Sequence, residues 1–357
     1  MTTSPDTAST EHDYEVSDWA ALLDGPVISV LMLAYNHGAY LAQAIEGVLA
    51  QQTDFPIELL IGEDCSTDDT RAVALRYQAA YPQTIRIIGA NHNVGMHRNG
   101  QRLIEASRGN LIAFCEGDDY WTDPQKLRLQ VGYLRTHPEA GAVHSDFDHV
   151  LAHGGQWRVL TRFQKRTRGE IPEGVIFEAL LAGNFIQTCT LCVRAALARE
   201  YLTSKLPIDS YAVGDWPLCL YISARHKIGY LDRSMAVYRK VPGSAMHGGD
   251  LKRLSMVTSY ALIIDDMCAY FGTQSSVRNA AHTSLYHSLS KLAFLADDLP
   301  TFEKCDQWLS THAPRLHARQ RQLLHWAMKR GPARSVIMCL IMLRRHLNEM
   351  LRYRSIK

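Results

Sequence analysis

Apolar residues form short, nearly continuous runs in the first 150 positions, and a polar segment follows most of these runs. Residues 27–34 read VISVLMLA, with a single polar side chain, which is typical of a strand buried on both faces. Similar runs predict four further strands, at residues 57–62, 84–88, 111–115 and 142–145.

Between these runs, apolar residues recur at the spacing of an amphipathic helix, as Leu41, Ile45 and Val48 do. Further helices are predicted at residues 67–81, 101–107 and 123–136. We expect Asp68 and Asp69 to lie in the first turn of the helix at 67–81. Strands that alternate with helices indicate an α/β fold with a Rossmann-like, mainly parallel sheet and flanking helices.

Ligands of such sheets bind in the crevice beyond the carboxyl ends of the strands. Four polar segments begin close behind predicted strands, at residues 35–38, 63–66, 91–99 and 116–119. The sequence therefore predicts one polar cleft at which these four segments converge.

The alternation weakens after residue 148, and residues 151–170 read as a basic loop or hairpin. Helices are predicted at 172–182 and 215–225, and one or two strands at 228–238. From about residue 249 onward the pattern is helical. The predicted organisation is a flexible arm at 1–25, an α/β domain at 26–248 with halves 26–150 and 151–248, and a helical region at 249–357.

The composition is that of a globular protein with a core, since 46% of the 357 residues are apolar and 21% are charged. It excludes a disordered chain, a collagen and a disulfide-stapled mini-protein. The net charge is only +2, yet residues 315–357 hold eleven Lys or Arg and one acid, Glu349. Such a basic tail indicates an anionic partner.

Residues 334–357 combine this charge with an apolar stripe, which is typical of an amphipathic helix in an anionic membrane interface. A helix packed on its own domain and a homodimer interface are the alternatives, and no nucleic-acid reader motif is present. The first 24 residues lack the features of a signal peptide, and no apolar run reaches the roughly 18 residues that span a bilayer. We therefore expect a cytoplasmic protein, peripheral on the inner face of the membrane if the tail binds lipid.

The eight cysteines are scattered, which favours reduced thiols over a disulfide framework. Cys189 and Cys192 form a CxxC pair, but no second Cys or His pair is placed to complete a zinc site. This favours buried, apolar cysteines over redox or zinc chemistry.

Four acids follow two of the predicted strands: Asp64 after one, and Glu116, Asp118 and Asp119 after the other. Carboxylates at neighbouring strand ends repel one another unless a cation joins them. A divalent metal shared with a phosphate ligand, Mg²⁺ or Mn²⁺, is the expected cation. Helix N-capping is the alternative role for any one of these acids.

Three segments together resemble the nucleotide-binding half of family 2 glycosyltransferases, which have the GT-A fold. They are PVISVLMLAYNHGAYLAQAIEGVLAQQ, IELLIGEDCSTDDT and NHNVGMHRNGQRLIEASRGNLIAFCEGDDYW, and the resemblance covers about residues 26–150. It implies an inverting, metal-dependent transfer of one sugar from a UDP- or dTDP-sugar to a glycan, lipid-linked or small-molecule acceptor. The family's processive synthases carry a Gln-x-x-Arg-Trp element and several membrane spans, and neither is found here.

The resemblance also implies roles for individual residues. Asp64 would hydrogen-bond the base, and residues 116–119 would act as the family's DxD element, although Glu116 stands where the family usually has Asp. The expected metal ligands are Asp118, Asp119 and His247. The residues expected to border the donor nucleotide are Ala34, Tyr35, Asn36, Asp64, Asn93, Arg98, Asn99, Glu116, Asp118 and Arg239.

A further acid, Asp215, precedes Trp216 at the start of a predicted helix, where members of the family place a catalytic Asp or Glu. An inverting transfer needs one general base to deprotonate the acceptor hydroxyl. Asp is also a favoured N-cap, and the two roles are compatible. We therefore predict Asp215 as the catalytic base.

Two other functions fit parts of the pattern. A nucleotidyltransferase also uses a Rossmann-like sheet with paired acids, but its first loop usually carries Lys or Arg, which residues 35–38 lack. A non-catalytic sugar-nucleotide-binding or scaffold protein is the other alternative. The presence of both Asp118 and Asp215 argues against it.

Overall fold

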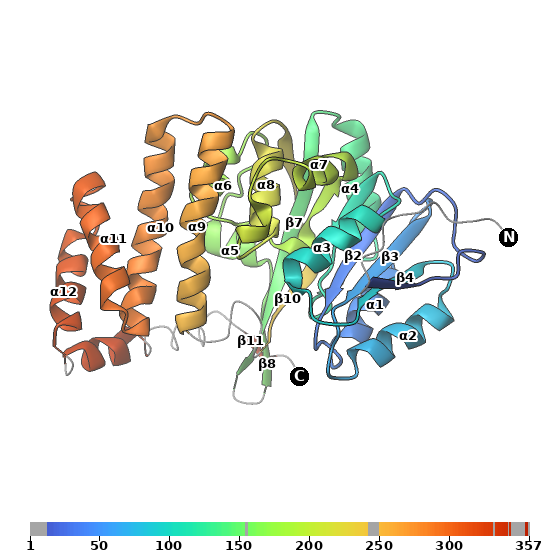
Figure 1. Cartoon of the computed structure of the whole chain (residues 1–357), viewed down its shortest axis with the longest axis horizontal. Helices are drawn as coiled ribbons and strands as arrows, with labels where there is room; N and C mark the ends of the chain where they lie inside the picture. The colour runs from blue at the N-terminus through green and yellow to red at the C-terminus, as the bar shows by residue number, and fades with distance from the viewer. Residues whose placement is uncertain are drawn as a thin grey trace.

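The computed structural model describes residues 13–153, 156–241, 250–330, 333–341, 343 and 354–355. In this part of the chain, eleven strands form one mixed sheet, which most of the helices flank (Figure 1). The strands are β1 (Asp13–Val16), β2 (Ile28–Ala34), β3 (Ile57–Glu63), β4 (Ile85–Ala90), β5 (Leu111–Phe114), β6 (Tyr120–Trp121), β7 (Ala140–His153), β8 (Gln156–Leu160), β9 (Cys192–Arg194), β10 (Lys227–Lys240) and β11 (Arg354–Ser355).

The parallel strands β4, β3, β2 and β5 form the half of the sheet that the first 115 residues build. The prediction of five strands from the apolar runs is confirmed: four of them are β2, β3, β4 and β5, with ends shifted by one or two residues, and the fifth run lies in the longer strand β7. Both faces of β2 are buried, with Val30 and Met32 on one side and Leu31 on the other. Two helix layers therefore exclude water from this half of the sheet.

The helices that cover the Val30 face are α1 (Leu41–Leu49), α2 (Thr70–Ala80) and α4 (Lys126–Thr136). The Leu31 face packs against α3 (Gly95–Ala106), α7 (Ala195–Leu202) and α8 (Asp215–Ser223). Two short helices, α5 (Phe163–Arg168) and α6 (Phe177–Leu181), follow the β7–β8 hairpin. The fold class expected from the sequence is confirmed by this arrangement.

The other half of the sheet mixes strand directions. β9 is antiparallel to both β5 and β7, whereas β10 runs parallel to β7, and β6 is antiparallel to β10. This half brings residues from beyond position 185 beside the first strands, so both halves of the chain contribute to one crevice.

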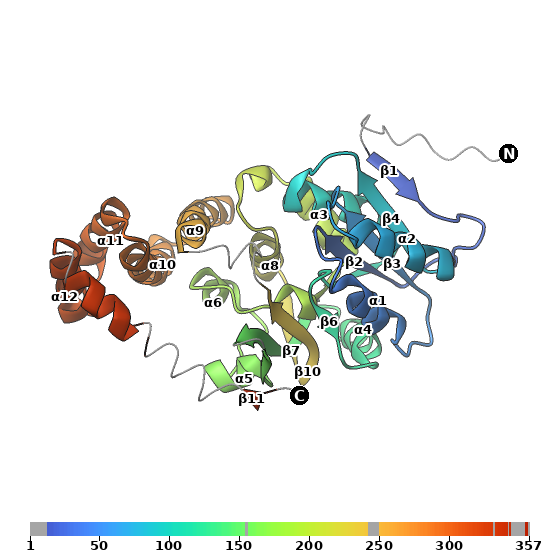
Figure 2. The same ribbon diagram turned by 90° about the horizontal axis from the view of Figure 1, so that it is seen from below.

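Four long helices form a row at the end of the molecule that lies opposite α2 (Figures 1 and 2). They are α9 (Asp250–Tyr270), α10 (Ser275–Ala296), α11 (Leu299–His312) and α12 (Ala318–Met328). Their buried side chains belong to the same apolar cluster as Leu31 and Trp216, so the row shares one core with the sheet. Among the described helices, none has the length and apolar character needed to cross a membrane.

The two ends of the chain differ from the expectation. Asp13–Val16 is not a flexible arm, because it pairs antiparallel with β4 and covers the edge of the sheet. At the other end, Arg354–Ser355 is a strand that pairs with β8, so the amphipathic helix expected at 334–357 does not extend to the end of the chain.

Two predicted helices start at other residues. α2 begins at Thr70 rather than at Thr67, because the Asp68 carboxylate instead accepts hydrogen bonds from the backbone N–H groups of Thr70 and Gly38. α3 begins at Gly95 rather than at Gln101, and Asp64 from the end of β3 accepts hydrogen bonds at its first turn, from Val94 N at 2.7 Å and Gly95 N at 3.0 Å. The capping residue of α3 follows a strand thirty residues earlier, so the sequence around residue 95 does not reveal where the helix begins.

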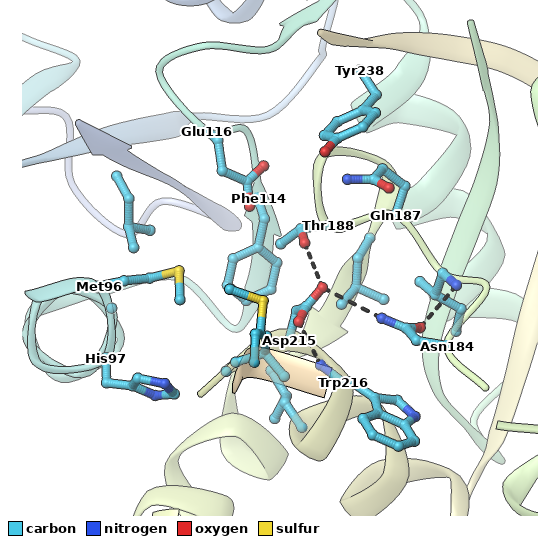
Figure 3. Close-up of a pocket in the computed structure, with 18 of the residues that line it drawn as sticks. Met96, His97, Phe114, Glu116, Asn184, Gln187, Thr188, Asp215, Trp216 and Tyr238 are labelled. Carbon is cyan, nitrogen blue, oxygen red and sulfur yellow. Dashed lines mark hydrogen bonds between the residues drawn. The ribbon is translucent and has the colours of Figure 1, made fainter. Parts of the chain in front are cut away.

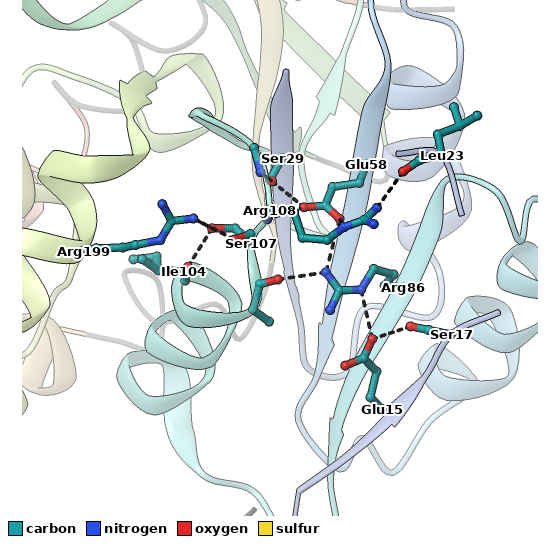
Figure 4. A network of polar contacts seen from close by, with 12 residues as sticks. Glu15, Ser17, Leu23, Ser29, Glu58, Arg86, Ile104, Ser107, Arg108 and Arg199 are labelled. Carbon is teal, nitrogen blue, oxygen red and sulfur yellow. Dashed lines mark hydrogen bonds and ion pairs between the residues drawn. The ribbon is translucent and has the colours of Figure 1, made fainter. Parts of the chain in front are cut away.

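A cluster of charged residues closes the amino ends of the parallel strands (Figure 4). The Glu58 carboxylate is 1% exposed and accepts hydrogen bonds from Ser29, from Arg86 at 3.2 Å and from Arg108 at 2.7 Å. Arg86 also bonds Glu15 of β1, which ties the N-terminal strand to the sheet. Burial alone would raise the pKa of Glu58, but these hydrogen bonds and the charge of Arg86 hold it below its ordinary value.

Glu58→Gln is expected to lower the free energy of unfolding by about 3 kcal/mol, because it removes the buried counter-charge of Arg86. Urea titration measures this change. Glu15→Gln is the matched control: Glu15 is 30% exposed, so its loss is expected to cost at most about 1 kcal/mol. Equal losses in the two variants would contradict the assignment.

The same carboxylate makes stability depend on pH. Because its pKa is lowered in the folded state, Glu58 stabilises the protein above the unfolded value near 4.5, and this contribution is lost as the pH falls through the folded value. The wild type is therefore expected to lose more stability than Glu58→Gln between neutral pH and pH ~3.5.

Candidate functional site

A cavity of about 1160 Å³ lies beyond the carboxyl ends of the parallel strands. The strand-end loops line one side of it, and residues of α5, α6, α9 and α10 also line it. Sites that hold a single drug-sized ligand usually have volumes of roughly 300–1,000 Å³. The cavity is therefore large enough for two substrates side by side.

The loop after β2 is fixed by the loop after β3. Asn36 has a positive φ of 56°, which Asn tolerates better than most residues, and its Oδ1 accepts a hydrogen bond from Thr67 N at 2.9 Å. His37 N donates to Thr70 Oγ1 at 2.7 Å. Ala34, Tyr35 and Asn36 all line the cavity.

Asp64 lies on the floor of the cavity and is 2% exposed. Its carboxylate caps α3, and Asn93 Nδ2 donates to its backbone oxygen at 3.4 Å. Asn99 lies in α3 rather than in a closing loop, and its side chain bonds Gly62 O at 2.8 Å. A Cβ on Gly62 would lie 2.5 Å from Asn99 Oδ1, so only glycine permits this approach of α3 to β3.

The acidic segment after β5 presents three carboxylates with different surroundings. Asp119 is buried, and its Oδ1 accepts a hydrogen bond from Arg239 N at 2.9 Å. Asp118 keeps 15% of its side chain exposed, and its Oδ2 lies 3.9 Å from His37 Nε2. Glu116 Oε2 is buried without a hydrogen-bond partner among the described residues.

The pKa values of two of these acids are strongly raised. Burial is the main cause for Glu116, with the charges of Asp118 and Asp215 adding to it, and together they raise the pKa to about 8 although a Thr188 hydrogen bond opposes the shift. Burial and the charges of Asp118 and Glu116 likewise raise the pKa of Asp119 well above its ordinary value. Crowding these acids into one buried wall of the cavity therefore disfavours their charged forms, which a bound cation would favour.

Asp215 is the first residue of α8, a helix that is otherwise buried on all sides. Its Oδ2 accepts hydrogen bonds from Thr188 Oγ1 at 2.8 Å and from Asn184 Nδ2 at 3.5 Å, and Trp216 N donates to its Oδ1 at 2.8 Å. Trp216 in turn donates from its ring nitrogen to Leu180 O at 2.9 Å. The carboxylate is thus held in one orientation in the cavity, as Figure 3 shows.

The cavity brings together most of the residues singled out in the sequence. Arg98 and Arg239 are exceptions, since neither lines it. Arg239 is buried, donates to Asp118 O and to Gln43, and has its guanidinium carbon 4.3 Å from the centre of the Tyr120 ring. His247 lies outside the described residues. The predicted residues that do line the cavity are Ala34, Tyr35, Asn36, Asp64, Asn93, Asn99, Glu116, Asp118, Asp119 and Asp215.

The donor set fits a hard divalent cation that is shared with a substrate phosphate. Within the described ranges, no group of three or more His, Cys, Asp or Glu side chains could hold a metal alone. Asp118 offers a carboxylate that reaches the cavity, and Glu116 adds an oxygen without a partner. One or two carboxylates with phosphate oxygens are the usual environment of Mg²⁺.

Sequence reasoning missed the residues that orient Asp215. Asn184 and Thr188 lie in a stretch that reads as apolar, and nothing in their local pattern indicates contact with a helix start thirty residues later. It also missed that α9 and α10 supply cavity residues, because amphipathic helices give no sign of the surface on which they pack.

Residues 29–200 match the sequence model of the family described as glycosyl transferase family 2. An uncharacterized protein of Mycobacterium bovis is 36% identical over 217 residues, which cover 60% of this chain and 58% of that protein. The chain thus spans a little over half the length of that relative.

Two solved structures share the fold. TarS of S. aureus in complex with UDP-GlcNAc superposes with a TM-score of 0.55 at 16% identity, covering 84% of this chain and 86% of that one. The mannosyltransferase PcManGT of Pyrobaculum calidifontis, in complex with GDP-Man and Mn²⁺, gives a TM-score of 0.52 at 15% identity, covering 88% and 87%. Sequence identities of 15–16% show only that the fold is shared. The family is indicated by the sequence match over residues 29–200. With its strand-end acids, its cavity and these matches, the chain carries a glycosyl transferase family 2 domain at residues 29–200 and has the GT-A fold.

Proposed function

We propose that this protein transfers a single sugar from a UDP- or dTDP-sugar to an acceptor hydroxyl, with inversion at the anomeric carbon. One observation carries the proposal: the oriented Asp215 carboxylate lines the same cavity as the strand-end acids of the GT-A domain. A glycan, a lipid-linked glycan or a small molecule is the expected acceptor. The solved neighbours that bind UDP-GlcNAc and GDP-Man support a nucleotide-sugar donor.

Asp215 acts as general base in this proposal. It accepts the proton of the acceptor hydroxyl as that oxygen attacks the anomeric carbon and the nucleoside diphosphate leaves. Hydrogen bonds from Thr188, Asn184 and Trp216 N fix the carboxylate, so little reorganisation is needed when the acceptor binds.

On the donor side, Asp64 and Asn93 hold the loop that borders the nucleotide. Asp118 is the expected metal ligand, because Asp119 is buried against Arg239 N. Mg²⁺ or Mn²⁺, when bound, would neutralise charge on the departing diphosphate. The neighbour that binds Mn²⁺ supports a divalent metal.

Arg239 serves here as a positioning residue rather than as a diphosphate ligand. Its backbone N–H and its guanidinium bond Asp119 and the backbone oxygen of Asp118. It therefore fixes the acidic segment from behind.

Contact of the basic C-terminal segment with an anionic membrane stays a prediction, as does a homodimer. Val336, Leu340 and Leu343 are 61%, 60% and 56% exposed, which leaves an apolar strip available for such a contact. The rest of the predicted amphipathic segment lies largely outside the described residues.

Asp215→Asn is expected to lower kcat at least about a hundredfold, because the amide cannot accept the acceptor's proton. The measurement is release of UDP or dTDP from the donor with methyl glycosides as acceptors. Thr188→Val is the matched control: it loosens the carboxylate without removing it and is expected to cost less. Wild-type turnover in Asp215→Asn would remove Asp215 from the mechanism.

UDP or dTDP is expected to raise the melting temperature more with Mn²⁺ than without it, by mass action on the native state. Asp118→Ala is expected to abolish the increment that needs Mn²⁺. The measurement is a thermal-shift titration with UDP, dTDP, GDP and CMP. Absence of any nucleotide shift in the wild type would contradict the proposed donor site.

A further inference from the structure

Charge is divided across the cavity. All the acids that line it, including Asp64, Asp118 and Asp215, come from the strand-end loops or from the start of α8. The wall built by α5 and α9 carries two arginines instead, Arg168 and Arg253. The part of the lining that α5 and α9 supply is thus basic, whereas the strand-end loops and the start of α8 supply the acids.

Arg168 ends α5, with its guanidinium carbon 5.1 Å from the centre of the Phe185 ring. It is open to the cavity, yet the surrounding protein desolvates it enough to lower its pKa. Within the described residues it forms no ion pair with a carboxylate, since the acids near α5 pair with Arg162 and Lys165 instead.

Arg253 lies in the first turn of α9 and is half-buried. Its charge and that of Asp215 act in opposite directions on the pKa of Tyr260, which burial raises to about 12, so both lie within electrostatic range of that phenol. Nevertheless no carboxylate in the described ranges lies within ion-pair distance of Arg253. The Tyr260 ring packs 4.9 Å from that of Trp216, the residue that follows Asp215, and Arg253 lines the same cavity as these three residues.

Hydrogen-bonding groups for hydroxyls lie on both sides of the cavity. Gln164 is 2% exposed and lines the cavity, and its Oε1 has no hydrogen-bond partner among the described residues. Asn184 and Gln187 line the cavity beside Asp215 (Figure 3). A buried amide oxygen without a donor costs free energy unless a ligand supplies one, and a sugar hydroxyl is such a donor.

We propose that the wall built by α5 and α9 is a subsite for an anionic saccharide, in which Arg168 and Arg253 bind a phosphate or carboxylate group and Gln164 binds a hydroxyl. Guanidinium groups match the geometry of both anions and form strong, charge-assisted hydrogen bonds with them. The identification of this saccharide as the acceptor rests on the proposed function. The binding of the anion to the two arginines does not.

The test is a thermal-shift titration of the full chain with glucose 1-phosphate, glucuronate and glucose, with and without saturating UDP and Mn²⁺. The nucleotide blocks the donor diphosphate site, so an anion that still binds must occupy another place. At least one of the two anionic sugars is expected to raise the melting temperature, whereas glucose is not. The sugar that binds distinguishes a phosphate from a carboxylate ligand.

Arg168→Gln and Arg253→Gln are each expected to weaken anion binding about tenfold, and the double variant more. Arg128→Gln is the matched control, because Arg128 is exposed on α4 and does not line the cavity. An unchanged UDP shift in all variants shows that they fold. Glucose binding as tightly as the anions, no binding of either anion, or wild-type anion binding in the double variant would overturn the proposal.

The two proposals fail separately. If UDP gives no shift but the anion still binds through the two arginines, the donor assignment is wrong and the anion site stands. If UDP binds and the anions bind independently of Arg168 and Arg253, the subsite is wrong and the proposed transfer is unaffected.

Discussion

Burial of β2–β5 on both faces is the constraint from which the rest of the molecule follows. Two helix layers cover these strands, so side chains that need water or a partner can lie only at the strand ends. The chain places charged clusters at both edges. The two clusters differ in whether their charges are paired, and this difference distinguishes a structural cluster from a binding site.

At the amino ends, Glu58 is matched by Arg86 and Arg108 and by a hydroxyl, and every strong charge has a partner. At the carboxyl ends, Glu116, Asp118 and Asp119 lie together, and no Lys or Arg of the described residues forms an ion pair with any of them. Arg239 N donates to Asp119, and His37 lies 3.9 Å from Asp118. The first cluster stabilises the fold. The second is destabilising until a cation and a phosphate compensate it, which is the usual condition of a binding site.

The buried parallel strands could be predicted from the sequence, because a strand buried on both faces needs a continuous run of apolar residues. Helix starts could not be predicted to the residue where the cap is distant: Asp64 caps α3 across thirty positions. The pairing of Asp13–Val16 with β4 was missed for a similar reason, since a polar edge strand shows its partner only in the folded chain.

The candidate site divides in the same way. Asp64, Asp118 and Asp215 could be found because each follows a strand or begins a helix in a recognisable motif. Asn184 and Thr188, which orient Asp215, could not, because their role depends on where α8 is packed. Arg168 lies in a segment that reads as a basic loop or hairpin, and Arg253 lies in a helix whose pattern does not show what it faces. The sequence match to the family ends before α9. The strand-end side of the cavity is therefore set by the backbone geometry of the strand ends, whereas the opposite wall is set by how α5 and the helical row pack on the sheet. A change in that packing would alter the opposite wall without disturbing the strand-end side.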